Sequence, residues 1–128
     1  MKIQESAENY LETILVLHQR NGHVRAIDIA GELDFSKPSV SIAMKNLREN
    51  GYVEVDGAGH ITLTEAGLEI AQRIYERHTF LAGWLSALGV DPAVAAEDAC
   101  RMEHVISAES FDAIRQFVRR HPEQLLPK

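Results

Sequence analysis

Residues 36–63 read SKPSVSIAMKNLRENGYVEVDGAGHITL, and they carry the strongest structural signals in the chain. The first half predicts a helix, because Ser36 is a good N-cap and Pro38 suits a first turn, where a missing N–H costs nothing. The pair Asn50-Gly51 supplies a left-handed end to this helix. The second half holds two short alternating segments around the turn sequence DGAG, which is typical of a β-hairpin. We therefore expect a helix that is followed directly by a hairpin.

Two further helices are predicted before this stretch. Apolar residues recur at helical spacing from Ser6 to Gln19, and a shorter helix is expected over about Ala26 to Leu33. The order helix, helix, tight turn, helix, hairpin is that of a winged helix-turn-helix. The third helix is then the DNA-reading element and the hairpin is the wing.

The second half of the chain is predicted to be helical throughout. A long linking helix is expected over about 64–88, another begins at Pro92, and Ser107 caps a last helix that stops before Pro122. The predicted fold class is mainly α, with a winged helix-turn-helix DNA-binding domain over 1–64 and an all-α metal-binding and dimerisation domain over 65–128.

Composition narrows the function classes. The chain has 128 residues and a net charge of −6, which argues against indiscriminate nucleic-acid binding. The charge reverses locally between Ser36 and Asn50, where Lys37, Lys45 and Arg48 face a single acid. One cysteine excludes an intramolecular disulfide, no apolar run is long enough to span a bilayer, and no secretory signal is visible, so we expect a cytoplasmic protein.

The third helix has one apolar stripe and one polar face. Its inner stripe is expected to be buried, and Ser41, Ile42 and Lys45 then project from the opposite side. Ile42 is either a stray surface hydrophobe or a contact to a thymine methyl group. The lysines and Arg48 are interpreted as phosphate contacts, because they cluster on one face of an acidic protein.

A cluster of metal-binding residue types lies in the helix that begins at Pro92. Cys100, Glu103 and His104 are spaced i, i+3, i+4 and share one face, which is typical of half a transition-metal site. Taken singly, each residue is also common as a small core residue or as ordinary surface. A catalytic Cys–His pair would need an oxyanion hole, and no Gly-rich strand-turn-helix surrounds Cys100, so we expect no enzyme.

The segment Asp98–Ser107, DACRMEHVIS, resembles the metal-binding helix of the diphtheria toxin repressor family of metal-dependent transcriptional repressors, which includes the manganese transport regulators. The similarity covers essentially the whole chain in family order. It extends through Asn9-Tyr10-Leu11-Glu12, Arg25 to Leu33, Ser36-Lys37-Pro38-Ser39-Val40-Ser41, Leu63-Thr64-Glu65-Ala66-Gly67 and Arg77-His78.

This resemblance implies a metal-activated repressor of metal homeostasis genes that binds operator DNA as a homodimer, without a membrane partner or a small-molecule substrate. Asn9 stands where the manganese branch has Asp and the iron branch has Met, so it is a poorer ligand than either. The implied metal ligands are Cys100, Glu103, His104, Glu12, His78 and Asn9. The candidate DNA-binding residues are Arg25, Ser36, Lys37, Pro38, Ser39, Ser41, Ile42 and Lys45.

The metal is expected to be Fe(II), with Mn(II) next, because Cys100 offers a thiolate where manganese regulators have a carboxylate. Zn(II), Co(II) or Ni(II) are expected to bind in vitro. The alternative is a winged-helix regulator with a vestigial metal site or a redox-sensing Cys100.

A homodimer is also predicted from the long linking helix, whose apolar residues exceed what a winged domain can cover. The alternative is that they pack only on the last helix, including Phe111, Ile114 and Phe117. The residues in question are Phe80, Leu81, Trp84, Leu85 and Leu88.

Overall fold

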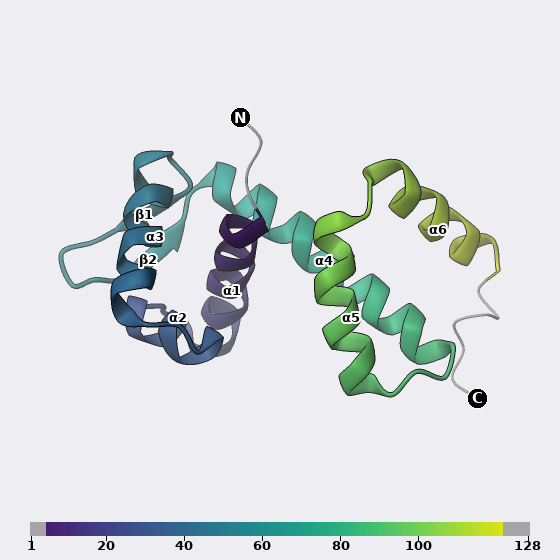
Figure 1. The fold of residues 1–128 in the computed structure, drawn as a ribbon. Helices are drawn as coiled ribbons and strands as arrows, with labels where there is room; N and C mark the ends of the chain where they lie inside the picture. The colour runs from purple at the N-terminus through teal and green to yellow at the C-terminus, as the bar shows by residue number, and fades with distance from the viewer. Residues whose placement is uncertain (1–4, 122–128) are drawn as a thin grey trace. The chain divides into compact units, whose positions relative to one another are not determined.

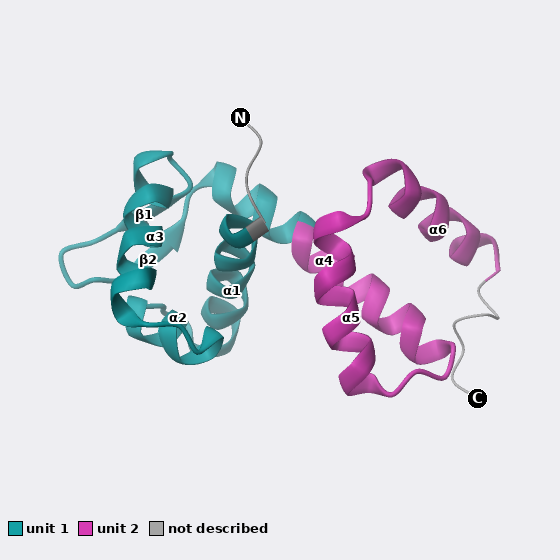
Figure 2. Cartoon of the chain, viewed as in Figure 1, with its two compact units in different colours: residues 1–73 teal, residues 74–128 magenta. Residues whose placement is uncertain are grey.

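The computed structural model describes residues 5–121 and divides into two compact units, residues 1–73 and 74–128 (Figures 1 and 2). The first unit includes the beginning of the long helix that the sequence analysis assigned to the second domain. A functional boundary at residue 64 stays a prediction, and residues 1–4 and 122–128 of the predicted domains lie outside the described residues.

The first unit is a winged helix-turn-helix, as predicted. Its elements are α1 (Glu5–Asn21), α2 (Ala26–Leu33), α3 (Lys37–Glu49), β1 (Val53–Val55) and β2 (Ile61–Leu63). Ser36 caps α3 through its side-chain oxygen, which accepts a hydrogen bond from the Ser39 N–H at 3.3 Å. The chain leaves α3 through Gly51, whose φ of +80° lies in the left-handed region that favours glycine.

The wing is a short antiparallel hairpin in which Val53 pairs with Leu63 and Val55 with Ile61. Asp56 organises its turn, because one carboxylate oxygen accepts the backbone N–H groups of Ala58 and His60, each at 2.9 Å. The hydrogen bond from His60 is the main reason that the pKa of Asp56 lies below its usual value.

One apolar core holds the first unit together. The stripe expected from helical spacing on α3 was Val40, Ala43, Met44 and Leu47. Three of these are buried, and Ala43 is half-buried against the same core. They pack with the other buried residues of the unit, which include Tyr10, Leu11, Ile14, Leu15, Leu17, Val24, Ile29, Ala30, Val53, Ile61 and Ala71. The loop before α2 joins the wing through a 2.7 Å hydrogen bond from the Ile61 N–H to the Val24 carbonyl.

The second unit consists of the later part of α4 (Glu65–Ala87) with α5 (Pro92–Val105) and α6 (Ala108–Arg120). Asp91 caps α5 and Ser107 caps α6 through their side-chain oxygens, as their positions in the sequence indicate. Leu81, Ala99 and Phe111 form the centre of a small core. No helix in residues 5–121 has the length and hydrophobicity to cross a bilayer.

Part of the apolar surface predicted for a dimer is used inside the chain. Leu81 is fully buried in this core, and the Phe80 ring meets the Phe111 ring edge-on at 5.5 Å. Leu88, by contrast, is 56% exposed, and Phe117 is 55% exposed. Packing on α6 therefore accounts for Phe80 and Leu81 but leaves other apolar side chains in contact with solvent.

Candidate metal centre and DNA-reading helix

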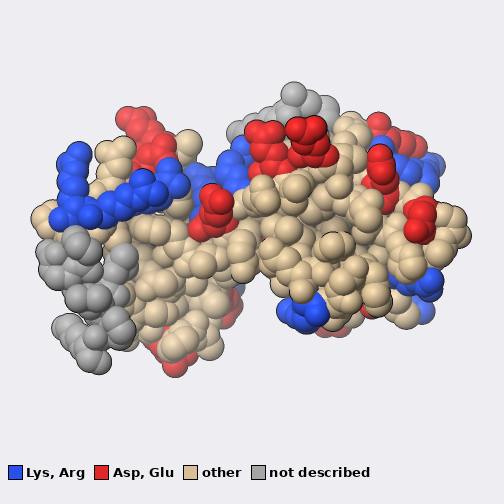
Figure 3. All heavy atoms as spheres, turned by 180° about the vertical axis from the view of Figure 1, so that it is seen from behind, with Lys and Arg blue, Asp and Glu red and all other residues tan. Residues whose placement is uncertain are grey.

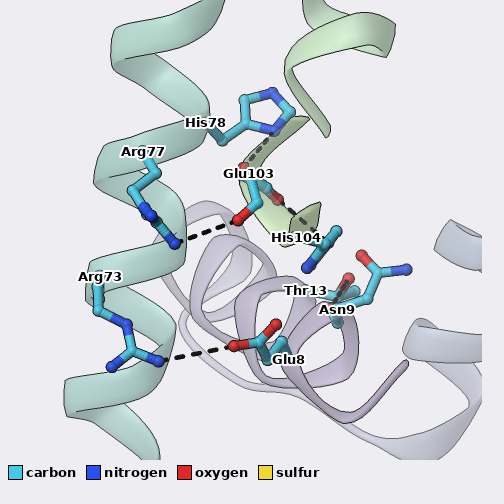
Figure 4. A network of polar contacts seen from close by, with 8 residues as sticks. All are labelled: Glu8, Asn9, Thr13, Arg73, Arg77, His78, Glu103 and His104. Atoms are coloured by element: carbon cyan, nitrogen blue, oxygen red, sulfur yellow. Dashed lines mark hydrogen bonds and ion pairs between the residues drawn. The ribbon is translucent and has the colours of Figure 1, made fainter. Parts of the chain in front are cut away.

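Glu103 lies in the last turn of α5 and is only 1% exposed, so its carboxylate is buried. Among the described residues, neither of its side-chain oxygens accepts a hydrogen bond. Two histidines approach it instead (Figure 4): His78 Nδ1 lies 3.3 Å from one oxygen and His104 Nε2 lies 3.4 Å from the other. A buried carboxylate of this kind is costly unless a cation or several donors compensate its charge.

His78, Cys100 and Glu103 form a three-residue cluster. One ligand atom from each residue lies within 4.8 Å of the other two. Donor atoms on one metal ion are about 3–4.5 Å apart when each bond is about 2.0–2.3 Å long, so a small closure would bring the three atoms onto one ion. An imidazole, a thiolate and a carboxylate suit a divalent transition metal. The residues present therefore fit the metal that the family resemblance implies.

Two helices position these ligands. Cys100 and Glu103 are separated by one turn of α5, which places them on one face as the i, i+3 spacing predicted. His78 comes from α4, 22 residues before Cys100 in the sequence. His104 has a side chain only 3% exposed and lies beside Glu103, although it is not part of the three-residue cluster.

Asn9 and Glu12, the remaining ligand candidates, lie on α1 of the first unit. Glu12 is 8% exposed, which is unusual for an acid, and Asn9 is half-buried. The Asn9 backbone carbonyl accepts a 2.8 Å hydrogen bond from the Thr13 hydroxyl. This bond does not involve the side-chain amide group of Asn9. Their assignment as ligands stays a prediction.

Arg77 is a residue for which the sequence analysis predicted no role. Its guanidinium group donates a hydrogen bond to the Glu103 carbonyl at 3.2 Å (Figure 4). It donates a second one to the Ile106 carbonyl at 3.3 Å. The acceptors are backbone atoms, which every residue carries, so no sequence pattern could have identified this contact.

Helix α3, which is predicted to read DNA, presents the outer face expected from its sequence. Ile42 is 63% exposed, and Ser41 and Lys45 beside it are also exposed. All eight candidate DNA-binding residues are exposed, namely Arg25, Ser36, Lys37, Pro38, Ser39, Ser41, Ile42 and Lys45. Two of them also shape the helix start, because the Ser36 hydroxyl donates a 2.8 Å hydrogen bond to the Ser39 hydroxyl. Their contacts with DNA stay a prediction.

Basic and acidic side chains are interspersed on the surface of the chain. On the face drawn in Figure 3, basic side chains occur in small groups among acidic and uncharged residues. DNA binding by a chain of net charge −6 must therefore depend on a few well-placed cations.

Two family profiles match the chain. The iron-dependent repressor N-terminal DNA-binding domain matches residues 2–61. The iron-dependent repressor metal-binding and dimerisation domain matches residues 64–124. The chain belongs to the iron-dependent repressor family. The resemblance to diphtheria toxin repressor and its manganese-regulating relatives, inferred from the sequence, is confirmed.

Individual relatives agree with this iron-dependent repressor assignment. The transcriptional regulator MntR of Escherichia coli O6:H1 is 36% identical over 118 residues, which are 92% of this chain and 76% of the relative. The HTH-type transcriptional regulator MntR of Listeria monocytogenes serotype 4a is 35% identical over 123 residues, which are 94% of this chain and 87% of the relative.

Solved structures of longer chains share the fold. The manganese regulator SloR superposes with a TM-score of 0.77 at 26% identity and covers 93% of this chain. The chain spans 55% of the SloR chain, about half the length of the solved structure. The common fold is therefore that of the two domains matched by the family profiles.

Proposed function

We propose that the chain is a transcriptional repressor that binds operator DNA when a divalent metal occupies the centre at His78, Cys100 and Glu103. Membership of the iron-dependent repressor family makes it a metal-responsive, DNA-binding regulator. The observation that carries the proposal is the buried Glu103 carboxylate, which lies within 4.8 Å of a ligand atom of His78 and of Cys100. Retardation of promoter DNA should require metal and should be reversed by a chelator.

In this proposal a bound metal links two helices, because His78 lies on α4 and Cys100 and Glu103 lie on α5. Once bound, a divalent ion supplies the positive charge that lets a buried carboxylate and a thiolate share one site. The family resemblance adds His104, Glu12 and Asn9 to the ligands, and this part rests on the sequence alone. We expect metal to favour the DNA-competent state because it binds that state more tightly than the other.

Metal selection is expected to depend on Cys100. A thiolate favours Fe(II), Co(II), Ni(II) or Zn(II) over Mn(II), so Fe(II) is the proposed physiological metal and Mn(II) the next candidate. Changing Cys100→Glu should shift the response towards Mn(II). The measurement is operator binding against Fe(II) and Mn(II) titrations under anaerobic conditions. An unmodified chain that responds to micromolar Mn(II), together with no relative shift in the variant, would contradict the role of Cys100 as the selecting ligand.

A homodimer is the proposed DNA-binding form, since the matched C-terminal profile describes a dimerisation domain. Two α3 helices could then enter successive major grooves, about 34–36 Å apart, on a pseudo-palindromic operator. Sedimentation of the metal-loaded chain at micromolar concentration should give twice the monomer mass. A monomer under these conditions would reject the dimer.

Two substitutions on the outer face of α3 are expected to act differently on DNA binding. Lys45→Ala should weaken binding to all DNA sequences. It should also reduce the slope of log affinity against log salt concentration by about 1, the value for one phosphate contact. Ile42→Ala should lower the preference for thymine at one position by about 1 kcal/mol. Binding-site selection on each variant measures both effects. If Ile42→Ala leaves the selection profile unchanged, Ile42 is a surface hydrophobe without a role in reading.

The remaining parts of the proposal concern chemistry and location. The matched relatives are transcriptional regulators. We expect no hydrolytic activity from Cys100 and His104, which an assay with ester and amide substrates checks. A cytoplasmic location stays a prediction.

A further inference from the structure

We propose that Arg77 is a positioning residue for the metal centre, and this inference rests on the function proposed above. It holds the carboxyl end of α5 against α4 in the position that brings Cys100 and Glu103 close to His78. The argument begins with the two hydrogen bonds of the Arg77 guanidinium group, which run from α4 to the carbonyls of Glu103 and Ile106.

Those two carbonyls lie at the end of α5, where backbone acceptors have no partner within the helix. The Ile106 N–H closes the helix on the Met102 carbonyl at 2.9 Å, and Arg77 takes the Glu103 and Ile106 carbonyls. A cation at a helix C-terminus is also favoured by the helix dipole. Arg77 therefore stabilises the last turn of α5, the turn that carries Glu103.

The same guanidinium group contacts α6. Its central carbon lies 4.9 Å from the centre of the Phe111 ring, within range of a cation–π interaction. Phe111 is 4% exposed and belongs to the core of the second unit. Arg77 is thus fixed on one side by a core ring and on the other by two carbonyls, which leaves it little freedom to move.

Arg77 directly precedes His78, and it binds the backbone of the residue whose side chain faces His78. Two neighbouring residues of α4 therefore contact the same residue of α5: Arg77 binds the Glu103 carbonyl, and His78 lies beside the Glu103 carboxylate. A metal centre is sensitive to displacements of a few tenths of an ångström, so groups that orient the ligands affect affinity. The two hydrogen bonds of Arg77 go to backbone carbonyls, so Arg77 acts through the position of Glu103.

The test is titration of the 128-residue chain with Co(II), whose absorption spectrum reports thiolate ligation and coordination geometry. Arg77→Met is expected to weaken Co(II) binding about tenfold, the scale found for residues that orient metal ligands. The d–d bands should shift as well, because the ligands no longer meet at the same geometry. Arg77→Lys keeps a cation and one hydrogen bond but not the planar fork, so an intermediate loss is expected.

Arg115→Met is the matched control. Arg115 also lies over the Phe111 ring, at 5.3 Å, but its ion pair is to Asp112 of its own helix, at 3.0 Å. This variant should bind Co(II) with an affinity within about twofold of the parent. An equal loss in both arginine variants would show that the contact to Phe111, and not the bonds to α5, controls the centre, and it would overturn the inference.

Thermal unfolding of the metal-free chain separates positioning from stability. Parental affinity and spectrum in Arg77→Met, whatever its melting temperature, would overturn the inference. If that variant does not fold, Arg77→Lys decides: parental affinity overturns the inference and an intermediate loss supports it. A parent chain that shows no thiolate-to-Co(II) band would instead contradict the proposed function, and the inference would fail with it.

Discussion

Glu103→Gln is expected to abolish metal-dependent operator binding and to leave the fold intact. Glutamine has the same size but is neutral and a weak ligand, so metal affinity should fall by more than about 100-fold, beyond the range for residues that only orient ligands. The metal-free chain should be at least as stable as the parent, because a buried carboxylate that accepts no hydrogen bond among the described residues is replaced by an uncharged group. Metal titration and urea unfolding measure the two effects.

Glu97→Gln is the control for this experiment. Glu97 lies on the same helix, and its exposed carboxylate pairs with Arg101 at 3.1 Å. An exposed pair at i, i+4 contributes about 0.3–0.5 kcal/mol, so this variant should retain the metal response and nearly all of the stability. If Glu103→Gln still requires metal for operator binding and binds it as tightly as Glu97→Gln, Glu103 is not a ligand.

The contrast between Glu103 and His78 shows how far the sequence leads towards the site. Cys100 and Glu103 are one turn apart on a single helix, so periodicity alone places them on one face. His78 lies on another helix, and no local pattern joins the two. Its part in the centre was predicted only from the family resemblance, and the structure brings its ring to 3.3 Å from the Glu103 carboxylate.

The helix boundaries were predictable because their signals are local. Ser36, Asp91 and Ser107 cap the helices that they were expected to cap. The two strands of the wing were expected over 52–55 and 60–63, and each begins one residue later, at Val53 and at Ile61. The Tyr52 N–H closes the end of α3 by donating to the Leu47 carbonyl at 2.9 Å, while the Tyr52 carbonyl still accepts from the Thr64 N–H at 3.1 Å.

Tertiary contacts account for what the sequence could not show. The apolar residues around Leu81 were interpreted as a dimer surface, with packing on the last helix as the alternative. The sequence cannot decide between the two, because it does not show whether the partner of an apolar side chain lies in the same chain. Phe111 supplies that partner for Leu81 and Phe80. The same limit applies to Arg77, whose acceptors are backbone carbonyls.

The close contact between Tyr52 and the first turn of α4 leads to the last prediction. Thr64 binds the end of α3 and the wing together, because its hydroxyl donates to the Gly51 carbonyl at 2.6 Å while its N–H donates to Tyr52. Gly67 then passes so near that a β-carbon there would collide with the Tyr52 carbonyl oxygen. Only glycine fits this approach without moving backbone.

Gly67→Ala should therefore lower the free energy of unfolding of the first unit by about 3 kcal/mol or more, the upper range for overpacking against rigid atoms. For a domain of this size the melting temperature would fall by more than about 10 °C. Metal-dependent DNA binding should be lost at the temperatures where the wing separates from α4. Thermal unfolding followed by circular dichroism gives the measurement.

Gly31→Ala provides the comparison within the same unit. Gly31 lies inside α2, and a β-carbon there meets nothing within 4 Å. Because alanine is favoured over glycine in a helix interior, this substitution should stabilise the unit by about 0.5–1 kcal/mol. The two glycine substitutions add the same methyl group and are expected to change stability in opposite directions. Equal melting temperatures for the two variants would mean that the wing can move away from Gly67 at no cost, and that the hydrogen bonds of Thr64 do not fix it.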